Sequence, residues 1–263
     1  MKIEDNRLIE AEYQPSPNHS GHFESEPDTI VIHFTAGGSR TSSSNWLCDK
    51  RAKASCHIVL GRDEKISQLV DFDTIAWHAG RSSWLERTSL NKYSIGIEID
   101  NAGKLKKSGQ EYYSHFGRKY DRDEVFIAKD GIPWHAFTEW QIENTVMACL
   151  ALKDIYPIEL ILGHHEISPG RKVDPGPAFP LDYVRNKVLN AGRKDQEDES
   201  ISEDPMALAS ENLNIRSGPG TQHPILRSPL PKGEKVKVMD AKNGWTKVEV
   251  TTSGWVSSRY LKT

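Results

Sequence analysis

One short segment, residues 163–176, concentrates side chains that bind metal ions or stabilise negative charge. It contains His164, His165, Lys172 and Asp174 among prolines and glycines, which restrict or reverse the backbone. Such a loop can hold an imidazole and a carboxylate in a fixed mutual geometry, as a metal site requires. The alternative is a plain surface connection, in which Asp174 only makes a turn before the following proline. The rest of the chain decides between these two interpretations.

Two further residues complete a set that could hydrolyse an amide. His33 lies near the end of a predicted buried strand, and Glu98 lies on another strand, facing away from the isoleucines that alternate with it. Catalytic zinc takes three protein ligands and leaves a fourth position for water, and His33, His164 and Asp174 form a suitable set. Glu98 could then accept a proton from that water, and Lys172 could stabilise an oxyanion. These residue types predict metal-assisted hydrolysis.

Strands and helices alternate along the part of the chain that carries these residues. Apolar and β-branched runs predict strands at Thr29–Phe34, Ser55–Leu60, Lys65–Val70, Ser94–Ile99 and Leu160–Leu162. Helices are predicted from the serine cluster at residues 42–44 to Lys50, from an N-cap at Thr138 to Pro157, and at Leu181–Leu189. This alternation predicts an α/β fold, in which helices cover the faces of a central sheet.

Composition divides the rest of the chain. Residues 1–27 are expected to form an irregular arm before a catalytic domain at residues 28–190, which contains a long polar and aromatic insertion at residues 101–137. An acidic linker follows at residues 191–205. Closely spaced short strands then predict a small all-β barrel at residues 206–263. Its strands are expected at Leu213–Arg216, Lys235–Met239, Thr246–Val250 and Trp255–Val256.

The composition also argues against several classes of protein. A formal net charge of −3 over 263 residues gives no reason to expect a nucleic acid partner. Three cysteines without metal-binding spacing indicate reduced and mostly buried thiols. We find no apolar run long enough to insert into a membrane, and no apolar signal segment near the first residue.

Five motifs follow one another through the predicted catalytic domain: Val31–Gly37, Ser55–His57, Ala76–Gly80, Ser94–Glu98 and Gly163–Gly176. This series resembles the zinc-dependent N-acetylmuramoyl-L-alanine amidases of type 2, which are related to peptidoglycan recognition proteins. The resemblance implies a mixed central sheet flanked by helices, and a zinc ion bound by His33, His164 and Asp174. It also implies that Glu98 is the general base and that Lys172 stabilises the transition state.

The resemblance is incomplete at one position and leaves three residues open. Some branches of the family place a catalytic tyrosine just before His57, where this chain has Cys56, so the base assignment rests on Glu98. We expect His57, Trp77 and His78 to contact the substrate. The alternative is that the histidines are structural and that the tryptophan only packs.

The C-terminal segment resembles a bacterial SH3 domain, through motifs at residues 213–221 and 254–261. Such modules commonly accompany cell-wall hydrolases and are thought to hold them on peptidoglycan. The resemblance is more specific for the fold of this segment than for its ligand.

Three functions agree with these features. The first is an amidase that cleaves peptidoglycan between N-acetylmuramic acid and L-alanine, held at the wall by the SH3-like module. The second is a cytoplasmic recycling amidase for soluble muropeptides, which the lack of a visible signal favours and the extra module disfavours. The third is a non-catalytic receptor, which typically lacks a zinc ligand, whereas all three candidates are present here. We expect the first, in a protein that is cytoplasmic as written or is exported to the wall; the sequence leaves its oligomeric state open.

Overall fold

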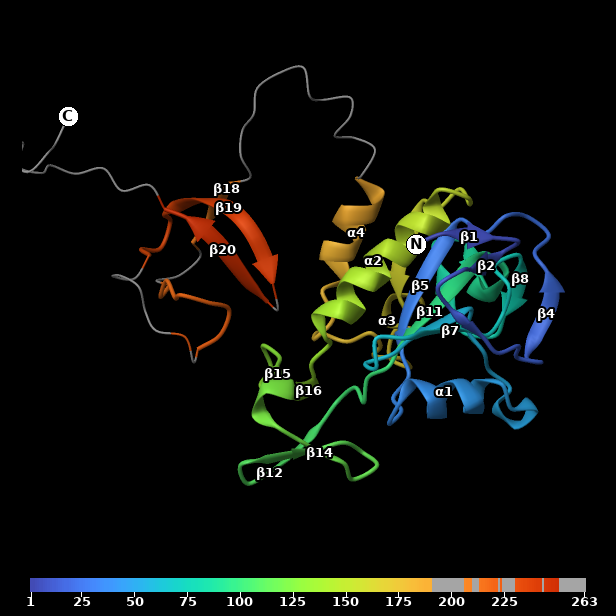
Figure 1. Cartoon of the computed structure of the whole chain (residues 1–263), viewed down its shortest axis with the longest axis horizontal. Coiled ribbons are helices and arrows are strands. Elements are labelled where there is room, and N and C mark those ends of the chain that lie inside the picture. Colours follow the sequence, from blue (N-terminus) through green and yellow to red (C-terminus); the bar gives the residue numbers. More distant parts are fainter. Residues whose placement is uncertain (191–205, 210–212, 222, 224–229, 243, 251–263) are drawn as a thin grey trace, which may run out of the picture. The chain divides into compact units, whose positions relative to one another are not determined.

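The computed structural model describes residues 1–190, 206–209, 213–221, 223, 230–242 and 244–250 (Figure 1). The chain divides into two compact units, Met1–Lys194 and Asp195–Thr263. The predicted linker at residues 191–205 and the predicted strand at Trp255–Val256 lie outside the described residues. Among the described helices we find no apolar span of the length that a bilayer requires.

A mixed six-stranded sheet forms the centre of the first unit. Its order is β17 (Leu160–Gly163), β5 (Thr29–Phe34), β11 (Ser94–Ile99), β6 (Ile58–Leu60), β7 (Ile66–Gln68) and β3 (Glu12–Tyr13). Neighbouring strands run parallel except β6 and β7, which form the predicted hairpin. The predicted mixed sheet and its main strands are therefore confirmed, with the hairpin strands shorter than expected.

Two helices cover one face of this sheet, α2 (Glu139–Lys153) and α4 (Leu181–Leu189) (Figure 1). A capping box between Thr138 and Gln141 begins α2, as predicted. Alternate side chains of β5 and β11 point toward these helices, because successive strand residues face opposite sides. The resulting core includes Ile30, Ile32, Ile95, Ile97, Ile99, Val146, Cys149, Leu152, Val184 and Val188.

The other face of the sheet carries Val31, His33 and Glu98, and α1 (Arg40–Leu47) packs on this side. The helix begins at an N-cap on Ser39, before the serine cluster that was predicted to cap it. A short 3-10 helix, η1 (Lys50–Ala52), follows it. The side chains of His33 and Glu98 therefore project from the sheet face opposite the main apolar core.

The N-terminal residues are not the irregular arm that their composition predicted. They form β1 (Ile3–Glu4), β2 (Arg7–Leu8), β3 and β4 (His19–His22). Strand β3 joins the edge of the central sheet, and β4 pairs with β8 (Thr74–Ala76). Strands β1 and β2 pair with each other, whereas the partners of β3 and β4 lie far along the sequence, so no local pattern indicated β3 and β4.

The insertion at residues 101–137 has structure of its own. It contains β12 (Lys106–Ser108), β13 (Glu111–Tyr113), β14 (Lys119–Tyr120), η3 (Arg122–Glu124), β15 (Val125–Ile127) and β16 (Pro133–His135). Its aromatics Tyr112 and Tyr120 are buried in a small separate cluster. Before β11, the chain also forms β9 (Ser83–Trp84), β10 (Arg87–Thr88) and η2 (Leu90–Lys92).

The described part of the second unit is an antiparallel three-stranded sheet of β18 (Met206–Leu208), β19 (Lys235–Lys242) and β20 (Trp245–Glu249). Ala209, Leu230 and Val236 form its small apolar cluster. The strand predicted at Leu213–Arg216 is reduced to isolated bridges at Leu213 and Arg216, of which the first pairs with Leu230. The described elements are all β, as the sequence predicted.

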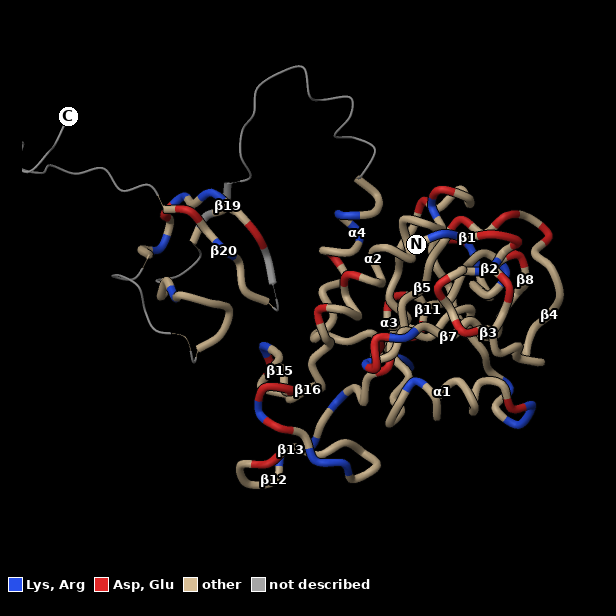
Figure 2. The backbone as a smooth tube through the Cα atoms, in the orientation of Figure 1, with Lys and Arg blue, Asp and Glu red and all other residues tan. Residues whose placement is uncertain are grey.

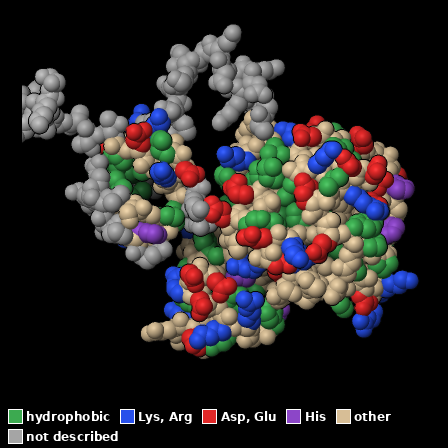
Figure 3. Space-filling model, in the orientation of Figure 1, with side chains coloured by type: hydrophobic (Ala, Val, Ile, Leu, Met, Phe, Trp, Pro, Cys, Tyr) green, Lys and Arg blue, Asp and Glu red, His purple; other side chains and the backbone are tan. Residues whose placement is uncertain are grey.

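Charged residues of both signs are distributed along the first unit (Figure 2). On the face drawn in Figure 3, acidic and basic side chains are interspersed. That face therefore favours neither a strongly acidic nor a strongly basic ligand.

Candidate metal centre

The three predicted ligands meet at one edge of the central sheet. His33 lies near the end of β5, His164 begins α3 (His164–Ile167) directly after β17, and Asp174 follows in the next loop. Nδ1 of His33 lies 2.8 Å from Nδ1 of His164, and Oδ2 of Asp174 lies 3.0 and 2.9 Å from these nitrogens. All three side chains are buried. No other group of three such side chains with this geometry occurs among the described residues.

Short-range hydrogen bonds hold the loop that carries His164 and Asp174. The N–H of Gly163 donates to Oε2 of Glu166 at 2.7 Å, and this carboxylate also pairs with an arginine of α4. The N–H of His165 donates to the main-chain oxygen of Asp174 at 2.9 Å. The segment predicted as a loop therefore begins with one helical turn, which fixes Asp174 relative to His164.

The donor atoms fit a divalent metal ion. Burial lowers the pKa of His33 to about 4, so its imidazole is neutral at pH 7, as a ligand must be. Three electron-rich atoms this close repel one another unless a cation lies between them. Tetrahedral ligands at about 2.0–2.1 Å from zinc are about 3.3 Å apart, slightly more than the spacing here.

Glu98 lies beside this cluster. Strand β11 runs parallel to β5 in a register that pairs Glu98 with His33, so both side chains leave the same face of the sheet. Among the described residues, Oε2 of Glu98 is buried without a hydrogen-bond partner. Burial and the charge of Asp174 raise the pKa of Glu98 to about 8, while the charge of Lys172 opposes this rise. A buried polar atom without a partner is rare, and here it indicates a position for water or substrate.

The raised pKa of Glu98 predicts a pH-dependent stability of the metal-free protein. The folded state keeps this proton up to about pH 8, whereas the unfolded chain releases it near 4.5. Stability therefore falls as the pH rises through this window, because the folded state binds more protons. The lowered pKa of His33 acts oppositely, but only below about 6.5. Between pH 6.5 and 8, the free energy of unfolding should fall by on the order of 1 kcal/mol per pH unit more in the wild type than in Glu98→Gln.

Denaturant unfolding of both metal-free proteins at several pH values tests this expectation. Other titrating groups contribute equally to the pH dependence of both proteins, so their contributions cancel in the comparison. One such group is His57, where burial lowers the pKa to about 4. Equal slopes for the two proteins would show that Glu98 ionises as it does in the unfolded chain.

A hollow of about 250 Å³ opens beside Glu98. It is lined by the loop after β5 and by α1, through Thr35, Ala36, Gly37, Ser42, Ser43, Trp46 and Leu47. A Cβ on Gly37 would lie 2.3 Å from Oγ of Ser43, so glycine lets the loop approach the helix closely. The ring of Trp46 is exposed at this site. The hollow gives a ligand access to Glu98 from the side of α1.

The residues expected to contact the substrate lie elsewhere. His57 is fully buried, with Nε2 2.9 Å from the carbonyl of Thr74 and Nδ1 accepting the N–H of Gly96 at 2.9 Å. Both ring nitrogens are used within the core, so the structure gives His57 the structural role and not a substrate contact. Trp77 is half-buried, and its Nε1–H donates to Oγ of Ser20 at 2.7 Å. Neither residue lines the hollow beside Glu98.

His78 is also buried. Asn91 and Arg171 hold its loop in place, and neither was predicted from the sequence to do so. Oδ1 of Asn91 accepts the N–H groups of His78 and Ala79 at 3.1 and 2.7 Å. Arg171 donates to the carbonyl of Ala79 at 3.1 Å. A role for Arg171 is indicated in the sequence only by its position beside Lys172. Nothing in the sequence distinguishes Asn91 from other polar residues between two strands.

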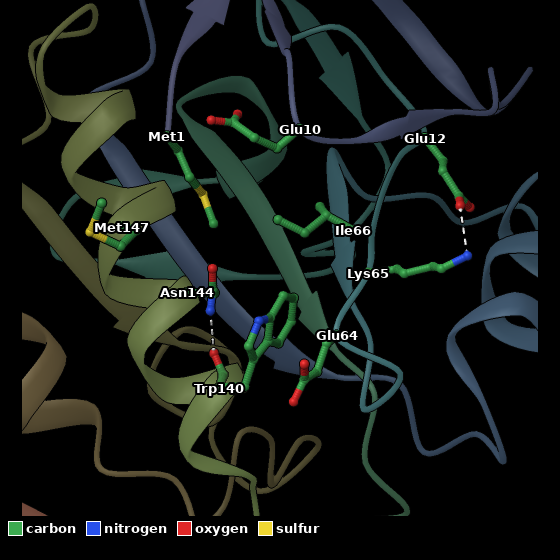
Figure 4. A pocket seen from close by; sticks show the side chains of 9 residues that line it. All are labelled: Met1, Glu10, Glu12, Glu64, Lys65, Ile66, Trp140, Asn144 and Met147. Atoms are coloured by element: carbon green, nitrogen blue, oxygen red, sulfur yellow. Dashed lines mark hydrogen bonds and ion pairs between the residues drawn. The ribbon is translucent and has the colours of Figure 1, made fainter.

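A larger hollow, of about 430 Å³, lies on another part of the first unit (Figure 4). It is lined by Met1, Glu10, Glu12, Glu64, Lys65, Ile66, Trp140, Asn144 and Met147. Glu12 pairs with Lys65 at 3.4 Å, and Nδ2 of Asn144 donates to the main-chain oxygen of Trp140 at 2.8 Å. This hollow brings together none of the residues predicted to act in catalysis or metal binding.

Comparison with known proteins finds similarity to amidases. The 1,6-anhydro-N-acetylmuramyl-L-alanine amidase AmpD of Escherichia coli (strain K12) is 29% identical over 209 residues, which cover 72% of this chain and 97% of AmpD. The N-acetylmuramoyl-L-alanine amidase AmiD of the same strain is 32% identical over 169 residues, which cover 62% of this chain and 53% of AmiD. A crystal structure of an AmpD selenomethionine derivative superposes with a TM-score of 0.54 at 28% identity, covering 72% of this chain and 99% of that one.

Two family models match separate parts of the chain. Residues 211–262 match the bacterial SH3 domain family. Residues 23–177, which include the candidate ligands and Glu98, match the N-acetylmuramoyl-L-alanine amidase family. The chain therefore belongs to the N-acetylmuramoyl-L-alanine amidase family, with a bacterial SH3 domain following the amidase region.

Proposed function

We propose that this chain is a zinc-dependent hydrolase that cleaves the amide between N-acetylmuramic acid and L-alanine in muropeptides. The observation that carries this proposal is the convergence of His33, His164 and Asp174 beside Glu98, whose buried Oε2 has no hydrogen-bond partner in the described part of the chain. The name of AmpD, nearly all of which this chain covers, supports an anhydro-muropeptide as the substrate.

The residues divide the reaction among them. His33, His164 and Asp174 would hold zinc, which when bound polarises the amide carbonyl and lowers the pKa of water to about 7. Glu98 accepts a proton from water as the water oxygen attacks the carbonyl carbon. The proton then passes from Glu98 to the amide nitrogen as the C–N bond breaks, which leaves a carboxylic acid on the lactyl group and a free amine on L-alanine. The acid then releases its remaining proton to solvent and becomes a carboxylate. Lys172 stabilises the negative charge that develops on the carbonyl oxygen.

Digestion of defined substrates tests this proposal. The full chain, loaded with zinc, is incubated with free anhydro-muropeptides and with intact sacculi, and the products are identified by mass spectrometry. We expect intact stem peptides that begin with L-alanine, and sugars that have lost their peptide. Cleavage within the stem peptide, or only between sugars, would contradict the proposed reaction.

The SH3 match favours a second substrate, the intact wall. We propose that this domain tethers the enzyme to peptidoglycan, as expected of a module joined to a wall hydrolase. A tethered binding module raises the local concentration of enzyme at an insoluble substrate and leaves the active site unchanged.

Removing residues 206–263 should therefore spare one activity and reduce the other. Turnover of a soluble anhydro-muropeptide should stay near that of the full chain, whereas release of peptides from sacculi should fall by about 10-fold or more. A pelleting assay with the isolated segment and purified sacculi measures binding directly. Equal losses on both substrates would mean that the segment shapes the active site instead of tethering it.

A further inference from the structure

One loop passes behind both candidate ligand histidines. Nε2 of His33 lies 3.1 Å from Nδ1 of His78, and Nε2 of His164 lies 3.0 Å from the carbonyl oxygen of Ala79. His78 and Ala79 are consecutive, and both are buried. Each ligand histidine therefore faces the metal position through Nδ1 and this loop through Nε2.

A histidine must be neutral to bind a metal ion, and in that form these contacts determine which ring nitrogen carries the proton. A carbonyl oxygen only accepts, and that of Ala79 lies closer to Nε2 of His164 than the Arg171 guanidinium does at 3.5 Å, so Nε2 carries the proton and Nδ1 keeps a lone pair. Nε2 of His78 lies 3.1 Å from the carbonyl oxygen of Ser94, so it carries a proton as well, and Nδ1 of His78 must accept. The donor to that atom is Nε2 of His33, which leaves a lone pair on Nδ1 of His33. Both lone pairs then face Asp174 and the metal position.

The surrounding fold holds the loop in this position. Asn91 fixes the two peptide N–H groups, which orients the Ala79 carbonyl, and Arg171 donates to the same carbonyl. Gly96 makes room for the imidazole, because a Cβ there would lie 2.3 Å from Cγ of His78. Residues from three separate segments therefore hold His78 and Ala79 in place.

We propose that His78 and the carbonyl of Ala79 form the outer shell of the metal centre, with His78 as a positioning residue that keeps Nδ1 of His33 free for the metal. This inference rests on the proposed function, in which His33 binds zinc. It replaces the substrate contact that the sequence predicted for His78. Replacing outer-shell partners of metal-bound histidines typically costs about 10–100-fold in metal affinity.

Two substitutions separate the hydrogen bond from the bulk of the ring. His78→Leu removes the acceptor, whereas His78→Asn places an amide oxygen near the position of Nδ1, since each atom is two bonds from Cβ. Competition titration against a chelating dye should show zinc binding weakened by about 10–100-fold in His78→Leu and largely restored in His78→Asn. His57→Asn is the matched control, because this neighbouring buried histidine bonds to Gly96 and Thr74 and not to a candidate ligand.

A second measurement does not depend on bound zinc. In the metal-free wild type, heteronuclear NMR should show His33 protonated at Nε2, and His78→Leu should shift the proton toward Nδ1. Thermal unfolding of each metal-free variant shows whether its fold is retained. A merely structural role for His78 would lower stability without changing the tautomer of His33.

The outcomes separate this inference from the function on which it rests. If His78→Leu binds zinc as tightly as the wild type and leaves the His33 tautomer unchanged, the outer-shell role is overturned and the proposed function stands. A wild-type chain that binds no zinc would overturn the proposed function, and the His33 signals would still decide whether His78 sets the tautomer.

Discussion

Asp174→Ala should lose the bound metal and nearly all hydrolytic activity together. Asp174 is the carboxylate among the three converging side chains, so its removal leaves only two imidazoles to bind the cation. The metal supplies several kcal/mol of transition-state stabilisation, and its loss should lower turnover by about 10³-fold or more. Elemental analysis of zinc per chain, beside turnover of an anhydro-muropeptide, measures both effects.

His165→Ala serves as a control for the ligand loop. His165 is exposed. Its Nδ1 contacts Asp174 through the main-chain oxygen, at 3.0 Å, and not through the carboxylate. This variant should keep its zinc, while His164→Ala should lose it. A full zinc complement in Asp174→Ala would remove Asp174 from the metal centre.

The sequence predicted those elements whose signals are local. The β-branched run of β5, the alternating isoleucines of β11 and the capping box of α2 each act through neighbouring residues. Their bounds therefore agree closely with the structure. The edge strand β3 depends on pairing with β7, which lies far along the chain. The polar composition of the segment around β3 therefore predicted irregular structure instead of a strand.

The candidate ligands could be named from residue type and motif, but their geometry could not. His33 and Glu98 come together because β5 and β11 are neighbours in a particular register, and that is a property of the whole sheet. The short distance between His33 and His164 likewise requires β17 to pair with β5. Such pairings decide which side chains meet, and no single segment specifies them.

His57 and His78 show why a sequence motif does not predict whether its histidine is buried or contacts the substrate. Both belong to motifs typical of a substrate-binding hydrolase, yet both are buried against the ligand face of the sheet. A histidine that supports a metal ligand and one that touches substrate have the same sequence signal. Their hydrogen-bond partners distinguish the two here, because His78 contacts His33 whereas His57 bonds to Thr74 and Gly96.

Glu98→Gln should keep the metal and lose the chemistry. Glutamine has nearly the shape of glutamate but cannot take a proton from water, so turnover should fall by about 10²–10⁴-fold. The three candidate ligands are unchanged, so the zinc content should stay at that of the wild type. Turnover and elemental analysis on the same preparation separate this result from that of Asp174→Ala.

The stability of Glu98→Gln supplies the control for this experiment. Burial disfavours the ionised carboxylate and raises the pKa of Glu98 to about 8, so a neutral amide should not weaken the metal-free fold at that pH. A large loss of turnover in a variant that unfolds no more readily and binds the same zinc therefore reports the missing proton acceptor. If such a variant instead turned over substrate at the wild-type rate, another group would have to take the proton from water, and Glu98 would be left without a catalytic role.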